Sequence, residues 1–184
     1  EERIGLAHML RETGLITKVR THEAGFRFLF PSMCDHDAYS GIGLVDPYNP
    51  YNPDENGQPR RTDGLLATQA ALAFLRARVH TTHVFLHGTS AGSMGAMSLA
   101  IALGRRGERL SGAILDSGVF HKYLPALSQT RCNPRYAPIG TLMPQRIGPY
   151  ASDPDLLPAG AVANGFVLTP LFDVWSRDDG SACG

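Results

Sequence analysis

The chain has 184 residues, 43% of them hydrophobic, and its formal net charge is zero. This length and hydrophobic content predict one globular domain with a sizeable core. The chain therefore lacks the large positive net charge typical of proteins that bind nucleic acids or anionic membranes, so neither is expected as a partner. The longest apolar run is also far too short to span a membrane.

The first part of the chain predicts a helix, a strand and a polar loop, in that order. Apolar residues at helical spacing indicate a short helix over Glu2–Arg11, and the aromatic run Phe26–Phe30 indicates a strand. The polar loop Cys34–Gly41 comes shortly after this strand, at the end where open α/β sheets bind ligands. From the spacing alone, however, we interpret Asp37 and His36 as residues of a solvated loop.

A longer loop, residues 46–61, is rich in Pro, Asn and Tyr. The spacing of Asn52, Asp54, Asn56 and Asp63 is faintly similar to that of a calcium-binding loop. Prolines interrupt the pattern, and the first ligand would be an asparagine. We therefore predict a turn-rich surface loop and expect no metal ion.

A strand, a G-x-S-x-G turn and a helix follow one another in the middle of the chain. The apolar run Val84–Leu86 predicts the strand, Gly88–Gly92 is the turn, and an Ala-, Leu- and Met-rich helix extends to Gly104. This order is typical of a nucleophile elbow, where glycines on both sides of a strained serine, here Ser90, prevent a collision. The N–H of Ala91 is then the first oxyanion donor. The alternative is an ordinary surface serine in a glycine-rich turn.

Strands and helices alternate around this turn. A helix capped by Thr62 or Asp63 precedes it, and a second buried strand, Gly112–Leu115, follows. Residues 119–163 predict an irregular insertion of the kind that forms a lid or substrate wall, and a last strand is expected at Leu171–Trp175. The alternation predicts an α/β fold with a mostly parallel, doubly wound sheet and helices on both faces.

The three cysteines, Cys34, Cys132 and Cys183, have no metal-ligand spacing. One disulfide and one free thiol would fit an exported protein, whereas three reduced thiols would fit a cytosolic one. The residues themselves leave both alternatives open.

Several segments together resemble the pectin acetylesterase and Notum family of serine carboxylesterases. They are the Cys34-x-x-Asp37-x-x-Ser40-Gly41 loop, the Gly88–Gly92 turn, the strand and turn Ile114–Phe120, and the stretch Thr169–Phe172 before Asp179. The resemblance implies an α/β-hydrolase-like fold, so we expect residues 1–184 to form a single α/β-hydrolase domain, incomplete at both ends. It also favours an extracellular, secreted protein.

The resemblance implies Ser90 as the nucleophile and Asp179 as the acid of a catalytic triad. Asp178 is one residue out of register and Asp116 follows an earlier strand, so both are weaker candidates for the acid. Asp37 is implied to lie near the mouth of the active site or to support it, without a catalytic step of its own. No metal or organic cofactor is implied.

Two features depart from the family pattern. The Gly-rich loop that supplies a second oxyanion donor would precede the chain, and no histidine follows Asp179 although the triad order is Ser, Asp, His. All seven histidines come earlier, at positions 8, 22, 36, 80, 83, 87 and 121. His36 and His121 lie in loops at plausible strand ends, but the sequence places neither within reach of the serine. We therefore expect the histidine base beyond Gly184.

The first functional hypothesis is a serine ester hydrolase that removes acetyl groups from a carbohydrate such as pectin, with a carbohydrate or small-molecule ester as its substrate. The second is a non-catalytic α/β-hydrolase domain that binds a carbohydrate or protein partner. A third, peptide hydrolysis, uses the same triad and is disfavoured only by the resemblance.

Overall fold

A computed structural model describes residues 25–33, 35, 37–45, 57–58, 61–116, 150 and 154–168. The chain divides into two units, residues 1–30 and 31–184, and every helix and strand described below belongs to the second. Among the described residues, no helix has the length and apolar character needed to cross a membrane. The expected helix at Glu2–Arg11, most of the insertion at residues 119–163, the expected strand at Leu171–Trp175 and the cysteines lie outside the described residues.

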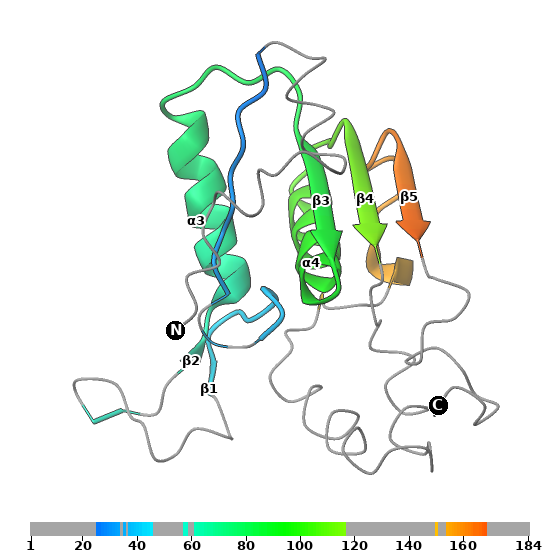
Figure 1. The fold of residues 1–184 in the computed structure, drawn as a ribbon. Helices are drawn as coiled ribbons and strands as arrows, with labels where there is room; N and C mark the ends of the chain where they lie inside the picture. Colours follow the sequence, from blue (N-terminus) through cyan, green and yellow to red (C-terminus); the bar gives the residue numbers. More distant parts are fainter. Residues whose placement is uncertain are drawn as a thin grey trace, which may run out of the picture. The chain divides into compact units, whose positions relative to one another are not determined.

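Two sheets and two α-helices make up the described part of the second unit (Figure 1). Strands β1 (Leu44–Val45) and β2 (Arg61–Thr62) pair antiparallel. Strands β3 (Phe85–Thr89), β4 (Gly112–Asp116) and β5 (Gly165–Leu168) form a parallel sheet in that order. The helices are α3 (Gly64–Arg76), α4 (Ala91–Arg105) and the short 3-10 helix η2 (Pro154–Leu156).

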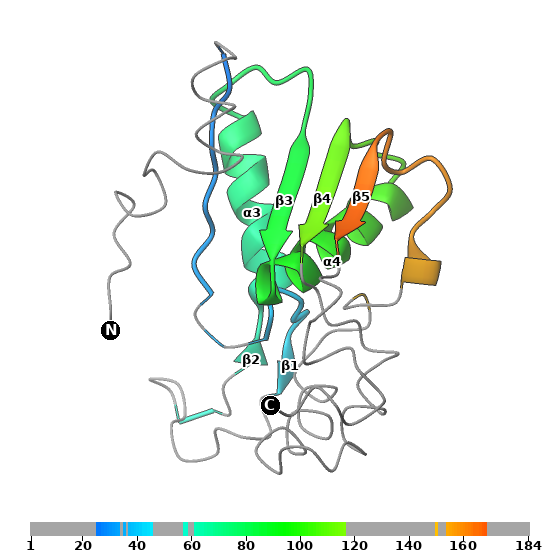
Figure 2. The ribbon, with the colours of Figure 1, turned by 45° about the vertical axis from the view of Figure 1, so that its right-hand side comes forward.

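The predicted alternation of strand and helix around the glycine-rich turn is confirmed. Helix α4 connects β3 to β4, and the register pairs Leu86 with Ala113 and Thr89 with Asp116. Parallel neighbours need such a crossover because the C-terminal end of one strand and the N-terminal end of the next lie at opposite ends of the sheet. Both views show α4 behind β3 and β4, with α3 beside it (Figures 1 and 2). The complete hydrolase-like topology, with helices on both faces, stays a prediction.

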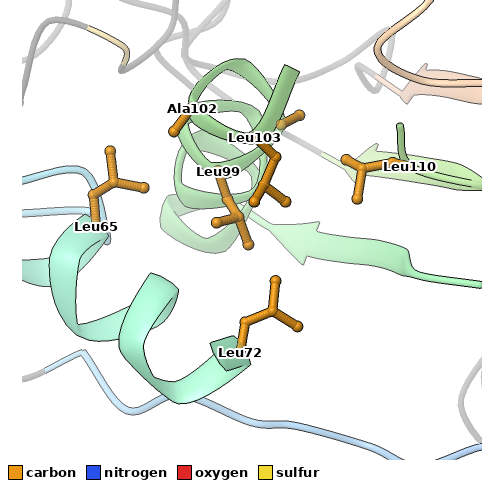
Figure 3. Packing of buried hydrophobic residues seen from close by; sticks show 7 residues of the cluster. Leu65, Leu72, Leu99, Ala102, Leu103 and Leu110 are labelled. Atoms are coloured by element: carbon orange, nitrogen blue, oxygen red, sulfur yellow. The ribbon is translucent and has the colours of Figure 1, made fainter. Parts of the chain in front are cut away.

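The core lies where α3, α4 and the sheet meet. One cluster joins Leu65 and Leu72 of α3 to Leu99 and Leu103 of α4, with Leu110 ahead of β4 (Figure 3). A second cluster on α4 and β4 consists of Ala96, Met97, Ile101 and Leu115. The central residues of α4 are therefore buried all round, as expected for a helix packed on two sides. Since β3 runs directly into α4, this packing also holds the start of the helix.

Two strand predictions differ from the structure. Phe26–Phe30 forms no strand, although the rings of Phe26 and Phe28 stack at 6.4 Å and those of Phe28 and Phe30 at 6.0 Å, as in extended chain. A segment forms a strand only when its backbone hydrogen-bonds to a neighbouring segment, so the alternation of residues within one segment does not determine whether it is a strand. Strand β5 was not predicted, because its short apolar run becomes a strand only by pairing with β4.

Ser98, in the middle of α4, is fully buried, and its hydroxyl has no hydrogen-bond partner among the described residues. An unpaired buried hydroxyl costs about 1–3 kcal/mol, and serine is a weaker helix former than alanine. We expect Ser98→Ala to raise the free energy of unfolding by about 1 kcal/mol in urea denaturation. The control, Thr68→Val, removes a hydroxyl that donates to the Gly64 carbonyl at 2.8 Å, so it should give no comparable gain. A less stable Ser98→Ala would contradict this reading.

Candidate active site

β3 runs into α4 through a sharp turn centred on Ser90. Ser90 has φ 55° and ψ −121°, a conformation that residues other than glycine rarely adopt. Its N–H donates to the carbonyl of Asp116 at 2.9 Å, and its carbonyl accepts the N–H of Ser93 at 2.9 Å. The predicted strained serine is confirmed, and its side chain is exposed where β3 ends.

Gly88 allows this turn to close. A Cβ atom at Gly88 would overlap the carbonyl oxygen of Gly92 and lie 2.6 Å from the backbone nitrogen of Ser93. A Cβ at Gly92 would instead meet no atom of the described residues within 4 Å. The prediction that glycines on both sides prevent a collision is therefore confirmed at Gly88 but not at Gly92.

The first turn of α4 presents a hydrogen-bond donor, the N–H of Ala91, next to the serine. No residue in the described part of the chain accepts a hydrogen bond from the N–H of Ala91, and the side chain of Ser90 does not cap the helix. Unpaired N–H groups at a helix N-terminus carry partial positive charge. This end of α4 can therefore stabilise negative charge that develops on an atom next to the Ser90 hydroxyl.

Asp37 is not a solvated loop residue, which corrects the interpretation from spacing. Its exposed fraction is 0%, and its carboxylate accepts three backbone N–H groups. Oδ1 accepts from Tyr39 at 2.8 Å, while Oδ2 accepts from Gly41 at 2.6 Å and Gly64 at 2.8 Å. Asp37 thus caps α3 from a separate loop. Asp63, at the N-cap position itself, makes no capping bond through its side chain, so the predicted cap by Asp63 is wrong.

A second carboxylate binds the same end of α3. Oδ2 of Asp35 accepts the N–H of Asp63 at 2.8 Å. Burial raises the pKa of Asp37 above its usual value of 3.8, and Asp35 raises it further, while the N–H groups of Gly64 and Gly41 act in the opposite direction. Sequence reasoning missed Asp35, because only the folded loop brings it to a helix that begins much later in the chain.

The raised pKa of Asp37 predicts a pH dependence. The folded chain binds this proton more tightly than the unfolded chain, so the stabilisation is complete below pH 3.8 and is lost as pH rises through the folded pKa. We therefore expect the parent to lose stability relative to Asp37→Asn as the pH rises above about 4. Urea denaturation of both proteins across this range measures the difference. If the parent instead gained stability relative to Asp37→Asn as the pH rises, the N–H donors would outweigh burial in setting the pKa of Asp37.

Of the other predicted site residues, Asp116 lies at the end of β4, paired in register with Thr89. Asp178 and Asp179 lie outside the described residues, and the approach of either carboxylate to the serine stays a prediction. Three histidines are described, at positions 80, 83 and 87, and no hydrogen bond from any of them to Ser90 is present in this part of the chain. The remaining histidines, at positions 8, 22, 36 and 121, are outside it.

No group of three or more His, Cys, Asp or Glu side chains among the described residues could hold a metal ion.

No protein-family model matches the chain, and neither a curated protein nor a solved structure shows significant similarity to it. The function proposed next depends on the geometry at Ser90 together with the motif resemblance.

Proposed function

We propose that the chain belongs to a serine carboxylic ester hydrolase that removes acetyl groups from a carbohydrate. The backbone of Ser90, at φ 55° and ψ −121° between β3 and α4, is the observation that carries the proposal. A residue held in such a conformation costs about 1–3 kcal/mol, which the surrounding structure must offset. The conformation presents the serine hydroxyl at a helix N-terminus, whose N–H groups stabilise the oxyanion formed when the serine acts as a nucleophile. An ordinary surface serine would gain nothing from this position.

In this mechanism Oγ of Ser90 attacks the ester carbonyl carbon while a histidine accepts the hydroxyl proton. The carbonyl oxygen becomes an oxyanion, to which the N–H of Ala91 donates. The histidine then gives the proton to the leaving alkoxide, which departs as the sugar hydroxyl. Water attacks the acetyl-serine, releases acetate and restores the serine. Asp179 orients the histidine.

Covalent labelling tests the nucleophile independently of the substrate. We expect a fluorophosphonate probe to add once to the complete protein, in which a histidine base is present to activate the serine, with the mass increase on the peptide that contains Ser90. Hydrolysis of 4-nitrophenyl acetate and release of acetate from acetylated pectin then test the reaction. A chain that binds acetylated pectin but shows neither labelling nor acetate release would support the non-catalytic binding domain instead.

The acid can be tested with a matched pair of variants. β5 ends at Leu168, and Asp173 follows it more closely than Asp179 does. Asp179→Asn should lower turnover by at least about 10²-fold because the histidine loses its orienting partner, while Asp173→Asn should retain turnover. The reverse result would move the acid to Asp173 and leave the serine mechanism intact.

A further inference from the structure

The loop Asp37–Gly41 lies against the helix that carries the candidate nucleophile. Ala38 and Tyr39 have positive φ angles of 55° and 59°, which turn the loop sharply. A Cβ atom at Gly95 would lie 2.5 Å from Cβ of Tyr39 and 3.1 Å from the carbonyl oxygen of Ala38. Gly95 begins the second turn of α4, so the loop backbone supports this helix directly behind its first turn.

Asp37 holds this loop in shape. Its bonds to the N–H groups of Tyr39 and Gly41 close the loop on itself, and the buried hydroxyl of Ser40 donates to the Asp37 carbonyl at 2.5 Å. Positive φ angles at non-glycine residues cost free energy, so the loop keeps them only while these bonds hold it. The bond from Gly64 to Asp37 ties the same loop to α3.

Helix α3 in turn packs on α4. Leu65, the residue after Gly64, belongs to the core cluster that includes Leu99 and Leu103 of α4. The N–H of Leu65 also donates to the Gly41 carbonyl at 3.0 Å, so a second bond joins the loop to the helix. One buried carboxylate therefore fixes a loop that contacts α4 directly, through Gly95, and indirectly, through α3.

We propose that Asp37 is a positioning residue for the reaction at Ser90. By fixing the loop Asp37–Gly41 against α4, it sets the direction of the Ser90 hydroxyl and of the Ala91 N–H. Asp37 does not touch the reacting atoms. This role rests on the proposed function, since it takes Ser90 as the nucleophile. It explains why a charged side chain is fully buried where a neutral residue would avoid the cost of desolvation.

Asp37→Asn and Asp35→Asn make the same chemical change at two carboxylates that both bind the N-terminal end of α3. At position 37 a single amide oxygen cannot accept the three N–H groups that now share two oxygens, and the new NH₂ group faces donors. At position 35 one amide oxygen can still accept the N–H of Asp63. We expect Asp37→Asn to lower kcat about 10- to 100-fold with KM changed less than about threefold, and Asp35→Asn to leave both unchanged.

Two further variants separate positioning from loss of stability. Gly95→Ala pushes the loop from the side of α4 while Asp37 stays intact, so the protein that folds should have a lower kcat than the parent. Leu72→Ala removes a core side chain of α3 away from the loop, so it should lower the urea midpoint without lowering kcat of the folded enzyme. A folded Asp37→Asn or Gly95→Ala with parental kcat would overturn the proposal.

An activity-independent measurement distinguishes this proposal from the proposed function. The N–H groups of Ser93 and Met94 donate to the carbonyl of Ser90, so their hydrogen exchange reports on the order of the turn. In Asp37→Asn we expect their exchange to be at least about tenfold faster than in the parent, with no such change in Asp35→Asn. If the parent neither turns over esters nor labels, the proposed function fails, and unchanged exchange in Asp37→Asn separately overturns the positioning role.

Discussion

Ser90→Ala is expected to lower acetyl-ester turnover by at least about 10³-fold while the fold stays intact, because removal of a triad nucleophile leaves only binding and oxyanion stabilisation. The measurement is steady-state hydrolysis of 4-nitrophenyl acetate, with the circular dichroism spectrum and urea midpoint of both proteins as the check on folding. Alanine relieves no strain at this position, since it also has a Cβ at a positive φ of 55°. A change in stability should therefore be small.

Ser93→Ala is the matched control for this experiment. Ser93 lies on the first turn of α4, its exposed fraction is 0%, and its hydroxyl has no partner among the described residues. Because a fully buried hydroxyl cannot reach a substrate, Ser93→Ala should retain the parental kcat. Equal turnover in Ser90→Ala and the parent would remove Ser90 from the mechanism. Loss of turnover in Ser93→Ala but not in Ser90→Ala would show that Ser93, and not Ser90, carries the reactive hydroxyl.

Gly88→Ala should have the largest effect on stability, lowering the free energy of unfolding by about 3 kcal/mol or more. The new methyl group would overlap the carbonyl oxygen of Gly92 and lie 2.6 Å from the backbone nitrogen of Ser93. Backbone atoms at the start of a helix cannot rotate away as a flexible side chain can, so β3 and α4 would have to separate. Urea denaturation measures the loss, and failure to accumulate as folded protein would be its extreme form.

Gly92→Ala provides the contrasting result from the other glycine of the same turn. Its Cβ would meet none of the described atoms within 4 Å, and alanine is a better helix former than glycine by about 1 kcal/mol. We expect Gly92→Ala to be as stable as the parent or more stable. Similar losses in both variants would show that the crowding is symmetrical, as the sequence pattern alone predicts.

The sequence by itself determined the turn at Ser90. A short apolar run, a glycine two residues before the serine and a helix-forming segment after it specify the strand, the sharp bend and the helix through interactions between near neighbours. For the same reason Gly112–Leu115 could be predicted as a strand, and in the structure this strand is one residue longer, ending at Asp116. Period and steric fit act over a few residues, and a sequence displays them directly.

The tertiary structure alone decided the features that depend on distant segments. Asp37 is buried and caps α3 because the loop folds back onto Gly64, a contact that no local spacing displays. Gly165–Leu168 is a strand because β4 lies beside it, whereas the more strongly patterned Phe26–Phe30 is not one. Hydrogen bonds between segments far apart in the chain form only after the core has brought them together, so their partners cannot be read from either segment alone.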